Sequence, residues 1–215
     1  MTVRIPNGST FDLASAYGSP ITISGISNAN PAVVTATGHG LANGDFIELK
    51  TGWSKLNERV FRVAGVTTNT FELEGVNSTS TSDYPASGGA GTCREITSWA
   101  RLIDVLETAS SGGEQQYYPY GTLESNEESQ IPTTRSPFTL TITVSDDTTP
   151  AYVAVAEAAD QDRQKRALRL NLPTGSIILY NGFVSFSETP SLTRNQAMTR
   201  TMSFAQDKRL VRYSA

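Results

Sequence analysis

The sequence is poor in the residues that most often carry chemistry. It contains one cysteine, Cys93, and one histidine, His39, and only 18% of its 215 residues are charged. A single cysteine excludes an internal disulfide and a CxxC metal site, so we expect a lone thiol. His39 stands between two glycines without evident partners for a catalytic relay, so we expect a turn residue. No apolar run approaches the ~18 residues of a membrane span, and no membrane contact is expected.

The composition favours a β-rich globular protein. The chain holds 27 Thr and 23 Ser, and threonine fits the pleated surface of a sheet while serine suits turns. The net charge of −4 argues against a protein that grips nucleic acid phosphates. Residues 1–162 carry eight basic and 19 acidic side chains, whereas residues 163–215 carry nine and two. Such an uneven distribution would suit self-association.

The first 76 residues read as short strands separated by turn residues. Apolar and polar residues alternate or β-formers cluster over 21–24, 31–37, 46–49, 59–63 and 70–73, and the last two segments flank a short turn typical of a hairpin. Residues 20–76 are therefore a candidate for a small β lobe within the protomer.

Two stretches read as long loops. Residues 77–93 consist almost wholly of small and polar residues, and residues 110–137 combine glycines, prolines and an acidic group. Neither has the apolar content to order itself, and loops of this length are usually functional or disordered.

The remainder alternates strongly. Residues 138–145 show the period of a strand buried on one face, and similar patterns cover 168–172, 177–180, 197–205 and 210–213. Between them we expect one helix, about 150–164, with Thr149 as N-cap and Pro150 at the first helical position. Asn181-Gly182 is open to two interpretations, a hairpin turn or a bulge within one long strand.

No group of residues supports catalysis. The glycines at 88–91 lack the lysine of a phosphate-binding loop, and the adjacent Asp146 and Asp147 cannot flank one glycosidic bond. The acidic group at 124–128 matches no calcium loop. Tyr117, Tyr118 and Tyr120 could stack on sugars or bases, but aromatic anchors of a protein interface fit them equally well. We expect no enzyme activity, no metal and no cofactor.

Several segments closely resemble the major tail tube proteins of long-tailed bacteriophages with non-contractile tails. Together they cover nearly the whole chain, and they occur in the family's order. A stretch at 30–45 is also similar to a small β module found in phage structural proteins. The matching segments are 113–117 (GEQQY), 130–133 (QIPT), 172–176 (LPTGS), 180–186 (YNGFVSF) and 188–199 (ETPSLTRNQAMT).

The resemblance implies a mainly β fold, a β-sandwich with a flanking helix and long assembly loops, with residues 1–215 as one protomer. It implies homohexameric rings stacked head to tail into the tail tube of the virion, assembled in the cytoplasm of the host bacterium. Partners would be other copies, the tape-measure protein, the tail terminator and the tail tip proteins. DNA would cross the lumen during genome ejection without specific binding, and a net acidic protein agrees with such passage.

We expect residues 111–135 to act between subunits, with their tyrosines as anchors and their glutamates facing basic residues of a neighbour. An alternative function is a carbohydrate-binding or adhesin-type module of a phage tail tip, with Trp53 and the three tyrosines as a stacking platform. The candidate assembly residues are Gln115, Gln116, Tyr117, Tyr118, Tyr120, Glu124, Glu127, Glu128, Arg194, Arg200, Lys208, Arg209 and Arg212.

Overall fold

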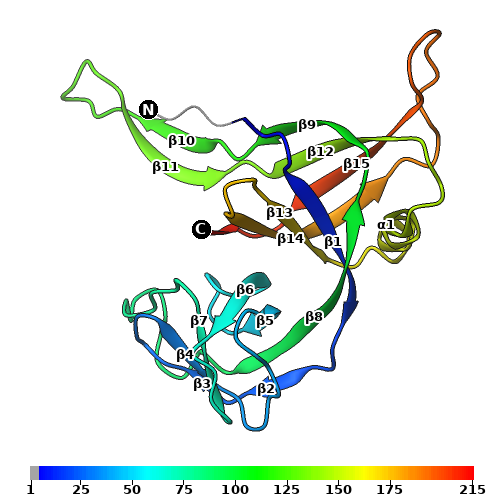
Figure 1. Cartoon of the computed structure of the whole chain (residues 1–215). Helices are drawn as coiled ribbons and strands as arrows, with labels where there is room; N and C mark the ends of the chain where they lie inside the picture. The colour runs from blue at the N-terminus through cyan, green and yellow to red at the C-terminus, as the bar shows by residue number, and fades with distance from the viewer. Residues whose placement is uncertain (1–4) are drawn as a thin grey trace.

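A computed structural model describes residues 5–215, and it confirms a mainly β protein with a single helix over that range. The strands gather into two lobes that lie one above the other in Figure 1. In chain order the elements are β1 (Thr10–Tyr17), β2 (Ile21–Ile23), β3 (Gly25–Ile26), β4 (Ala32–Thr35), β5 (Phe46–Thr51), β6 (Arg59–Ala64), β7 (Thr70–Leu73), β8 (Gly91–Leu102), β9 (Val105–Gly112), β10 (Gln115–Tyr120), β11 (Ser129–Arg135), β12 (Phe138–Ser145), α1 (Ala151–Asp162), β13 (Arg166–Asn171), β14 (Ile177–Phe186), β15 (Thr199–Gln206) and β16 (Val211–Tyr213).

The smaller lobe contains β2 to β7 and the first half of β8. Its strands follow the order β3-β4-β7-β6-β5-β8, and β2 pairs with β8 as well. The hairpin expected from residues 59–73 is confirmed, since β6 pairs antiparallel with β7. Inward-facing aliphatic and aromatic side chains, among them Ile47, Trp53 and Phe71, form a core of its own.

Seven strands of the larger lobe pair antiparallel in the order β8-β1-β13-β14-β15-β12-β9, and β16 pairs with β14 as well. Consecutive strands β8 and β9 lie at its two ends, joined only by Ile103 and Asp104, so the sheet must fold back on itself around a core. Alternation along β12 is as expected from the sequence: Leu140, Ile142 and Val144 are buried while the intervening threonines are half-buried.

Helix α1 packs against β14, β8 and β1 and covers this core with Tyr152, Val153, Ala156 and Ala159. The helix lies where the sequence predicts it, but the predicted N-cap is wrong by one residue. Pro150 occupies that position, and the Thr149 hydroxyl donates to Asp147 Oδ1 at 2.8 Å instead. The aspartate thus engages the side chain that would otherwise cap the helix.

A third apolar cluster joins the two lobes. Ala14, Ile96, Ala167 and Leu179 of the larger lobe pack with Val60 of β6, on the sheet face opposite to α1. The buried Tyr213 reinforces the contact between the lobes by accepting from Arg62 N–H at 2.8 Å, and the half-buried Tyr17 accepts from Ala167 N–H at 2.9 Å within the larger lobe. Burial raises the pKa of each phenol to about 12, so both remain protonated at neutral pH.

The segment expected as a loop over 77–93 is shorter and more ordered than its composition indicates. Strand β8 already begins at Gly91, and the preceding turns are fixed by polar contacts rather than by apolar burial. The fully buried Ser78 hydroxyl donates to Ser27 O at 2.6 Å, and Asn28 Nδ2 donates to Ser78 O and Tyr84 O.

The loop expected over 110–137 is also a wrong prediction, because β10 and β11 occupy most of it. Asn181-Gly182 is neither a turn nor a bulge. Both residues lie inside the continuous strand β14, paired in regular register with β13 and β15. A Cβ at Gly182 would lie 2.1 Å from Ala205 O, so the close approach of β15 requires glycine here.

Candidate assembly surface

A two-stranded arm extends from the larger lobe (Figure 1). Within residues 5–215, strands β10 and β11 pair only with each other, with Tyr118 opposite Ile131 and Tyr120 opposite Ser129. The arm prolongs the β9–β12 hairpin across a short interruption, where Gly113 N–H donates to Ser136 O at 3.2 Å. Gly112 and Gly113 both have positive φ there, near 80°, which glycine adopts without steric cost.

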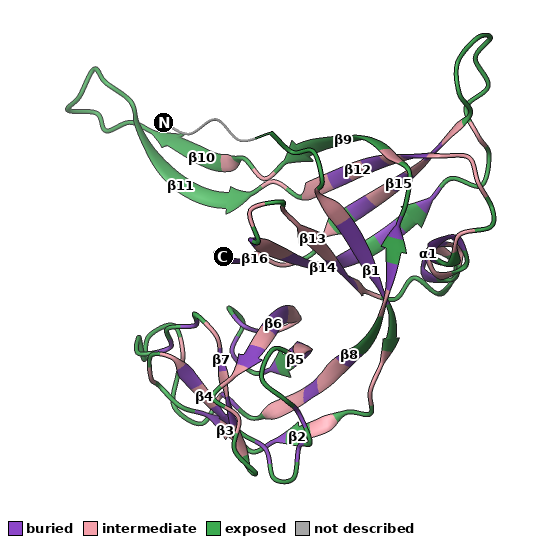
Figure 2. Ribbon diagram, viewed as in Figure 1, coloured by how far each residue is buried: buried purple, intermediate pink, exposed green. Residues whose placement is uncertain are grey.

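Both faces of the arm are open to solvent, as Figure 2 shows. Tyr117, Tyr118 and Tyr120 are 56%, 62% and 43% exposed, and Ile131 on the partner strand is 50% exposed. An isolated two-stranded hairpin is at best marginally stable in water, and exposed aromatic groups of this size usually mark an interaction site. The arm therefore has the properties of a segment that another molecule covers.

The two glutamines at the base of the arm serve its own backbone. Gln115 Nε2 donates to Gln116 O at 3.1 Å and to Thr134 O at 3.2 Å, on the opposite strand. Gln116 O also accepts from the Thr133 hydroxyl at 3.2 Å. These bonds stabilise the pairing next to the Gln115–Tyr117 irregularity of the register.

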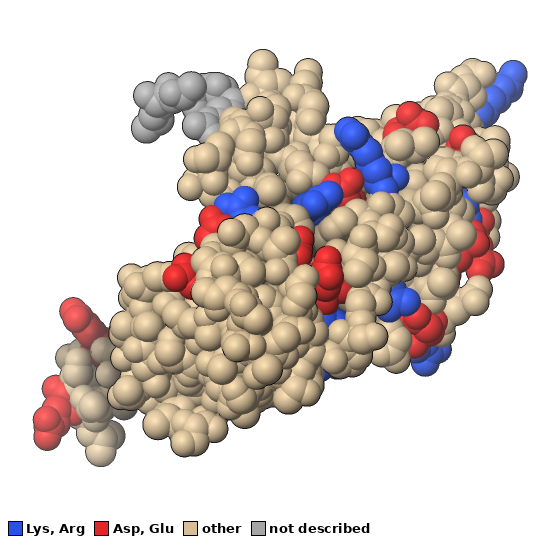
Figure 3. Space-filling model, turned by 60° about the horizontal axis from the view of Figure 1, so that its bottom comes forward, with Lys and Arg blue, Asp and Glu red and all other residues tan. Residues whose placement is uncertain are grey.

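The tip of the arm, residues 121–128, is acidic. Glu124, Glu127 and Glu128 are exposed, and within the described part of the chain none of them forms an ion pair. Figure 3 shows acidic side chains gathered at this far end of the molecule. Three uncompensated carboxylates at the end of an arm favour a cationic partner surface.

The five basic residues expected to face these glutamates do not form one surface. Arg194 is exposed in the loop between β14 and β15, whereas Lys208 and Arg209 lie between the lobes and Arg212 is exposed on β16. Arg200 differs from the expectation: only 4% of it is exposed, and its guanidinium lies 3.3 Å from Glu157 Oε1 of the same chain, over the Phe186 ring.

Much of the charge asymmetry seen in the sequence is neutralised inside one chain. Arg169 pairs with the buried Asp12 at 2.9 Å, and Lys165 lies 2.7 Å from Glu58 and 2.9 Å from Asp207. Segments of opposite charge thus meet within the protomer. Only those basic residues that remain uncompensated are available to a neighbour.

Glu48 forms the centre of a buried polar contact between the lobes. It is 1% exposed, its Oε2 accepts from Arg94 Nε at 2.5 Å, and its Oε1 accepts from Asn181 Nδ2 at 3.0 Å. Asn181 Nδ2 also donates to Glu58 O at 3.0 Å. No sequence pattern indicates this group, since Glu48, Arg94 and Asn181 lie on three strands that meet only in the fold.

Two residues considered for chemistry are structural. Leu41 N–H donates to His39 Nδ1 at 3.1 Å, so Nε2 carries the proton that it shares with Thr67 O at 3.0 Å, and both ring nitrogens are engaged. Trp53 is 2% exposed and donates to Pro85 O at 2.8 Å. It cannot contribute to a stacking platform with the tyrosines of the arm.

Residues 5–215 contain no cluster of metal-ligating side chains. The single helix of the same range is neither long nor apolar enough to cross a membrane.

Cys93 is a free, buried thiol on β8, and burial raises its pKa to about 12. The unfolded thiol ionises at lower pH, so this burial stabilises the fold below the unfolded pKa, and the contribution is lost between about 9 and about 12. At pH 8.5 the native thiolate fraction is roughly a thousandfold smaller than in unfolded chain. We expect Ellman's reagent to modify native protein at least about 100-fold more slowly than protein in guanidinium chloride. Equal rates would contradict the buried placement.

Comparison with known proteins identifies the family. The model of a family described as phage tail tube protein, TTP, matches residues 51–215, which include the arm, α1 and every strand from β6 to the C-terminus. No curated protein gives a significant match. Among solved structures, the chain is similar to the anti-feeding prophage cap, the AFP tube terminating cap, with 15% identity and a TM-score of 0.38, over 54% of this chain and 83% of that one. A likeness of that size does not establish a common fold. The family match spans well over half of the chain and all of its candidate assembly residues, and on this ground the chain belongs to the phage tail tube proteins and is a structural protein of the virion tail.

Proposed function

We propose that this protein self-assembles into homohexameric rings that stack head to tail, forming the tube through which the phage genome leaves the capsid. Assembly takes place in the cytoplasm of the host bacterium, around the tape-measure protein, with the tail terminator and the tail tip proteins at the two ends. The protein acts as a building block and has no enzyme activity.

The observation that carries this proposal is the arm. Its strands have no apolar core beneath them and its three tyrosines are exposed, so a free monomer gains little from ordering it. A neighbouring copy could bury the tyrosines and hold the arm in place. The entropy cost of ordering the arm would then be offset only at the growing end of a tube. This agrees with the family assignment.

A second feature supports closed rings. Among the described strands, β9 pairs with β12 alone, and most of its residues are exposed. An open sheet edge promotes uncontrolled pairing between molecules unless another element covers it. A ring with heterologous contacts gives each edge a neighbour, and closure limits growth to the tube axis.

DNA passes the lumen without specific binding. With a net charge of −4, the protein as a whole repels DNA phosphates. Each lysine or arginine that faced the lumen would instead hold a phosphate.

A carbohydrate-binding or adhesin-type module at the tail tip is the alternative. Its proposed platform loses Trp53, which is buried in the other lobe, and the remaining three tyrosines lie on an arm without a concave surface of its own. Sugar sites are concave and preformed, so the arm fits a protein interface better.

Electron microscopy of the purified full-length protein tests the proposal. We expect rings with six-fold symmetry and tubes built from them, with the subunit fraction in tubes rising with protein concentration. Monodisperse monomers at all concentrations, retained on a glycan array, would support the adhesin-type alternative and overturn the tube.

A further inference from the structure

A basic groove lies between the base of the arm and the smaller lobe. It consists of two adjoining hollows of about 730 and 480 Å³ that share Lys208 and Arg209. Arg135 and Phe138 line the first hollow, and Lys55 and Arg59 line the second. Four segments far apart in the sequence thus meet around one opening.

The charges of the groove do not balance. Lys55 pairs with Asp83 at 2.7 Å, and Lys165 and Lys208 together offset Glu58 and Asp207. Among the described residues, no carboxylate pairs with Arg59, Arg135 or Arg209. Three guanidinium groups are therefore left without an anion.

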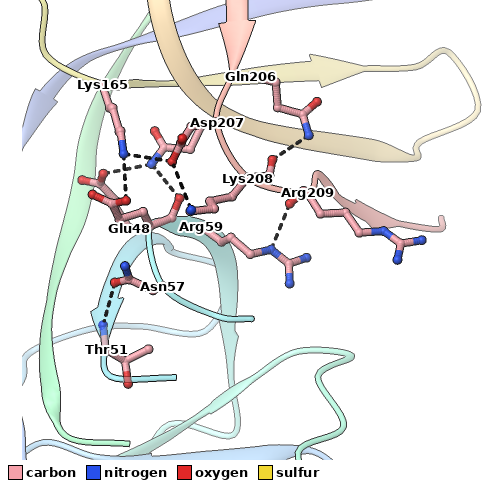
Figure 4. Close-up of polar contacts among 11 residues, drawn as sticks. Glu48, Thr51, Asn57, Arg59, Lys165, Gln206, Asp207, Lys208 and Arg209 are labelled. Atoms are coloured by element: carbon pink, nitrogen blue, oxygen red, sulfur yellow. Dashed lines mark hydrogen bonds and ion pairs between the residues drawn. The ribbon is translucent and has the colours of Figure 1, made fainter. Parts of the chain in front are cut away.

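Arg59 is held in place by backbone carbonyls rather than by charge. Its guanidinium donates to Lys55 O at 2.8 Å, to Arg209 O at 2.9 Å and to Leu210 O at 3.2 Å. Burial is the main cause that lowers its pKa, and the positive charge of Arg209 also lowers it, while Tyr84 and Tyr213 act in the opposite direction. Figure 4 shows the guanidinium groups of Arg59 and Arg209 pointing the same way, away from the ion pairs of Lys165. An anion placed beside them would relieve this repulsion.

The geometry points to the acidic arm tip of a second copy of this chain as the occupant of the groove, an inference that rests on the proposed tube. Glu124, Glu127 and Glu128 equal the three unbalanced arginines in number and carry the opposite charge. Carboxylate–guanidinium pairs give directional recognition because the arginine fork fits two oxygens. Dissolved salt screens such pairs less when they are partly buried between the lobes than when they lie on an open surface.

The arm cannot fill the groove of its own chain. Strand β10 is six residues long, about 20 Å at the rise of an extended strand. The groove lies at the base of the arm, beside Gly112 and Gly113, while the tip extends away from it (Figure 1). The contact is therefore heterologous, with tip and groove on different surfaces, as head-to-tail stacking requires.

Charge reversal with rescue tests this docking. The tip variant carries Glu124→Lys, Glu127→Lys and Glu128→Lys, and the groove variant carries Arg135→Glu and Arg209→Glu. Arg59 is left unchanged because it holds backbone carbonyls. We expect each variant to raise the critical concentration for tube formation at least tenfold, measured by light scattering at 50 mM salt. A chain carrying both sets should return to within about threefold of wild type.

The matched control carries Lys50→Glu and Arg101→Glu, the same charge change on two exposed basic residues that lie outside the groove and outside the candidate assembly residues. It should neither impair assembly nor rescue the tip variant. Rescue by the control, or no rescue by the groove variant while wild type forms tubes, would overturn the docking and leave the proposed tube standing. Wild type without rings or tubes would overturn both. Binding of a 30-base-pair DNA by wild type, lost in a groove variant that still forms tubes, would assign the groove to nucleic acid instead.

Discussion

Protein in which residues 115–135 are replaced by a short Gly/Ser linker is expected to fold as a monomer and to form no tubes at any concentration. The linker would join Glu114 to Ser136, which already lie within hydrogen-bond distance, so the β9–β12 pairing is preserved. The deleted strands contribute no residue to the three apolar clusters. We therefore expect the melting temperature to change little, while the exposed tyrosines that would pack on a neighbour are lost. Size-exclusion chromatography with light scattering and electron microscopy measure the two effects.

A matched pair of milder variants keeps the arm and tests whether assembly depends on the contact area of its tyrosines. Replacing Tyr117, Tyr118 and Tyr120 by phenylalanine keeps the rings and should leave tubes intact. Replacing the same three tyrosines by serine should abolish tube formation, because the aromatic contact area is lost. Tubes of normal diameter from the linker variant would show that the arm is dispensable and that assembly depends on other surfaces.

Glu48→Ala is expected to lower the free energy of unfolding by about 3 kcal/mol. The carboxylate is almost fully buried and accepts from Arg94 and Asn181, and removing one partner of a buried pair leaves the other charge uncompensated. For a chain of this length the melting temperature should fall by roughly 6–12 °C. Urea unfolding followed by tryptophan fluorescence gives the free energy, and calorimetry gives the temperature.

Asp83→Ala is the control for that measurement. Asp83 also pairs with a cation, Lys55 at 2.7 Å, but both side chains are about half exposed, so we expect a much smaller loss than for Glu48→Ala. Equal losses for Glu48→Ala and Asp83→Ala would mean that burial adds nothing to the contact between the lobes.

The sequence predicted those elements whose faces differ in burial. Leu140, Ile142 and Val144 alternate with threonines because one face of β12 meets the core, and α1 likewise presents an apolar face. The arm escaped prediction for the complementary reason. Every residue of β11 is exposed, so no alternation exists to be read, and Pro132 and the acidic tip resemble a loop in composition.

The candidate assembly residues divide in a similar way. The tyrosines and glutamates were found because an aromatic and an acidic group are visible within one short segment. Arg59 and Arg135 were missed because they reach the groove from β6 and β11, far from the basic C-terminal segment in sequence. Arg200 was included for its position in that segment, although the fold buries it. At Asn181-Gly182, pairing on both sides overrides the local preference for a turn.

Strand β8 is one unbroken element shared by both lobes: Cys93 and Glu95 pair with the smaller lobe, and Ile96 to Leu102 pair with β1. Rotating one lobe against the other would break the apolar cluster that contains Ile96 and Val60, and the hydrogen bonds that Asn181 donates to the smaller lobe. The two lobes of each protomer are thus held together as one body, and the arm is joined to that body through an interrupted ladder. In a tail built as proposed, curvature must be taken up where copies meet, so its flexural stiffness is a property of the arms and grooves rather than of the fold.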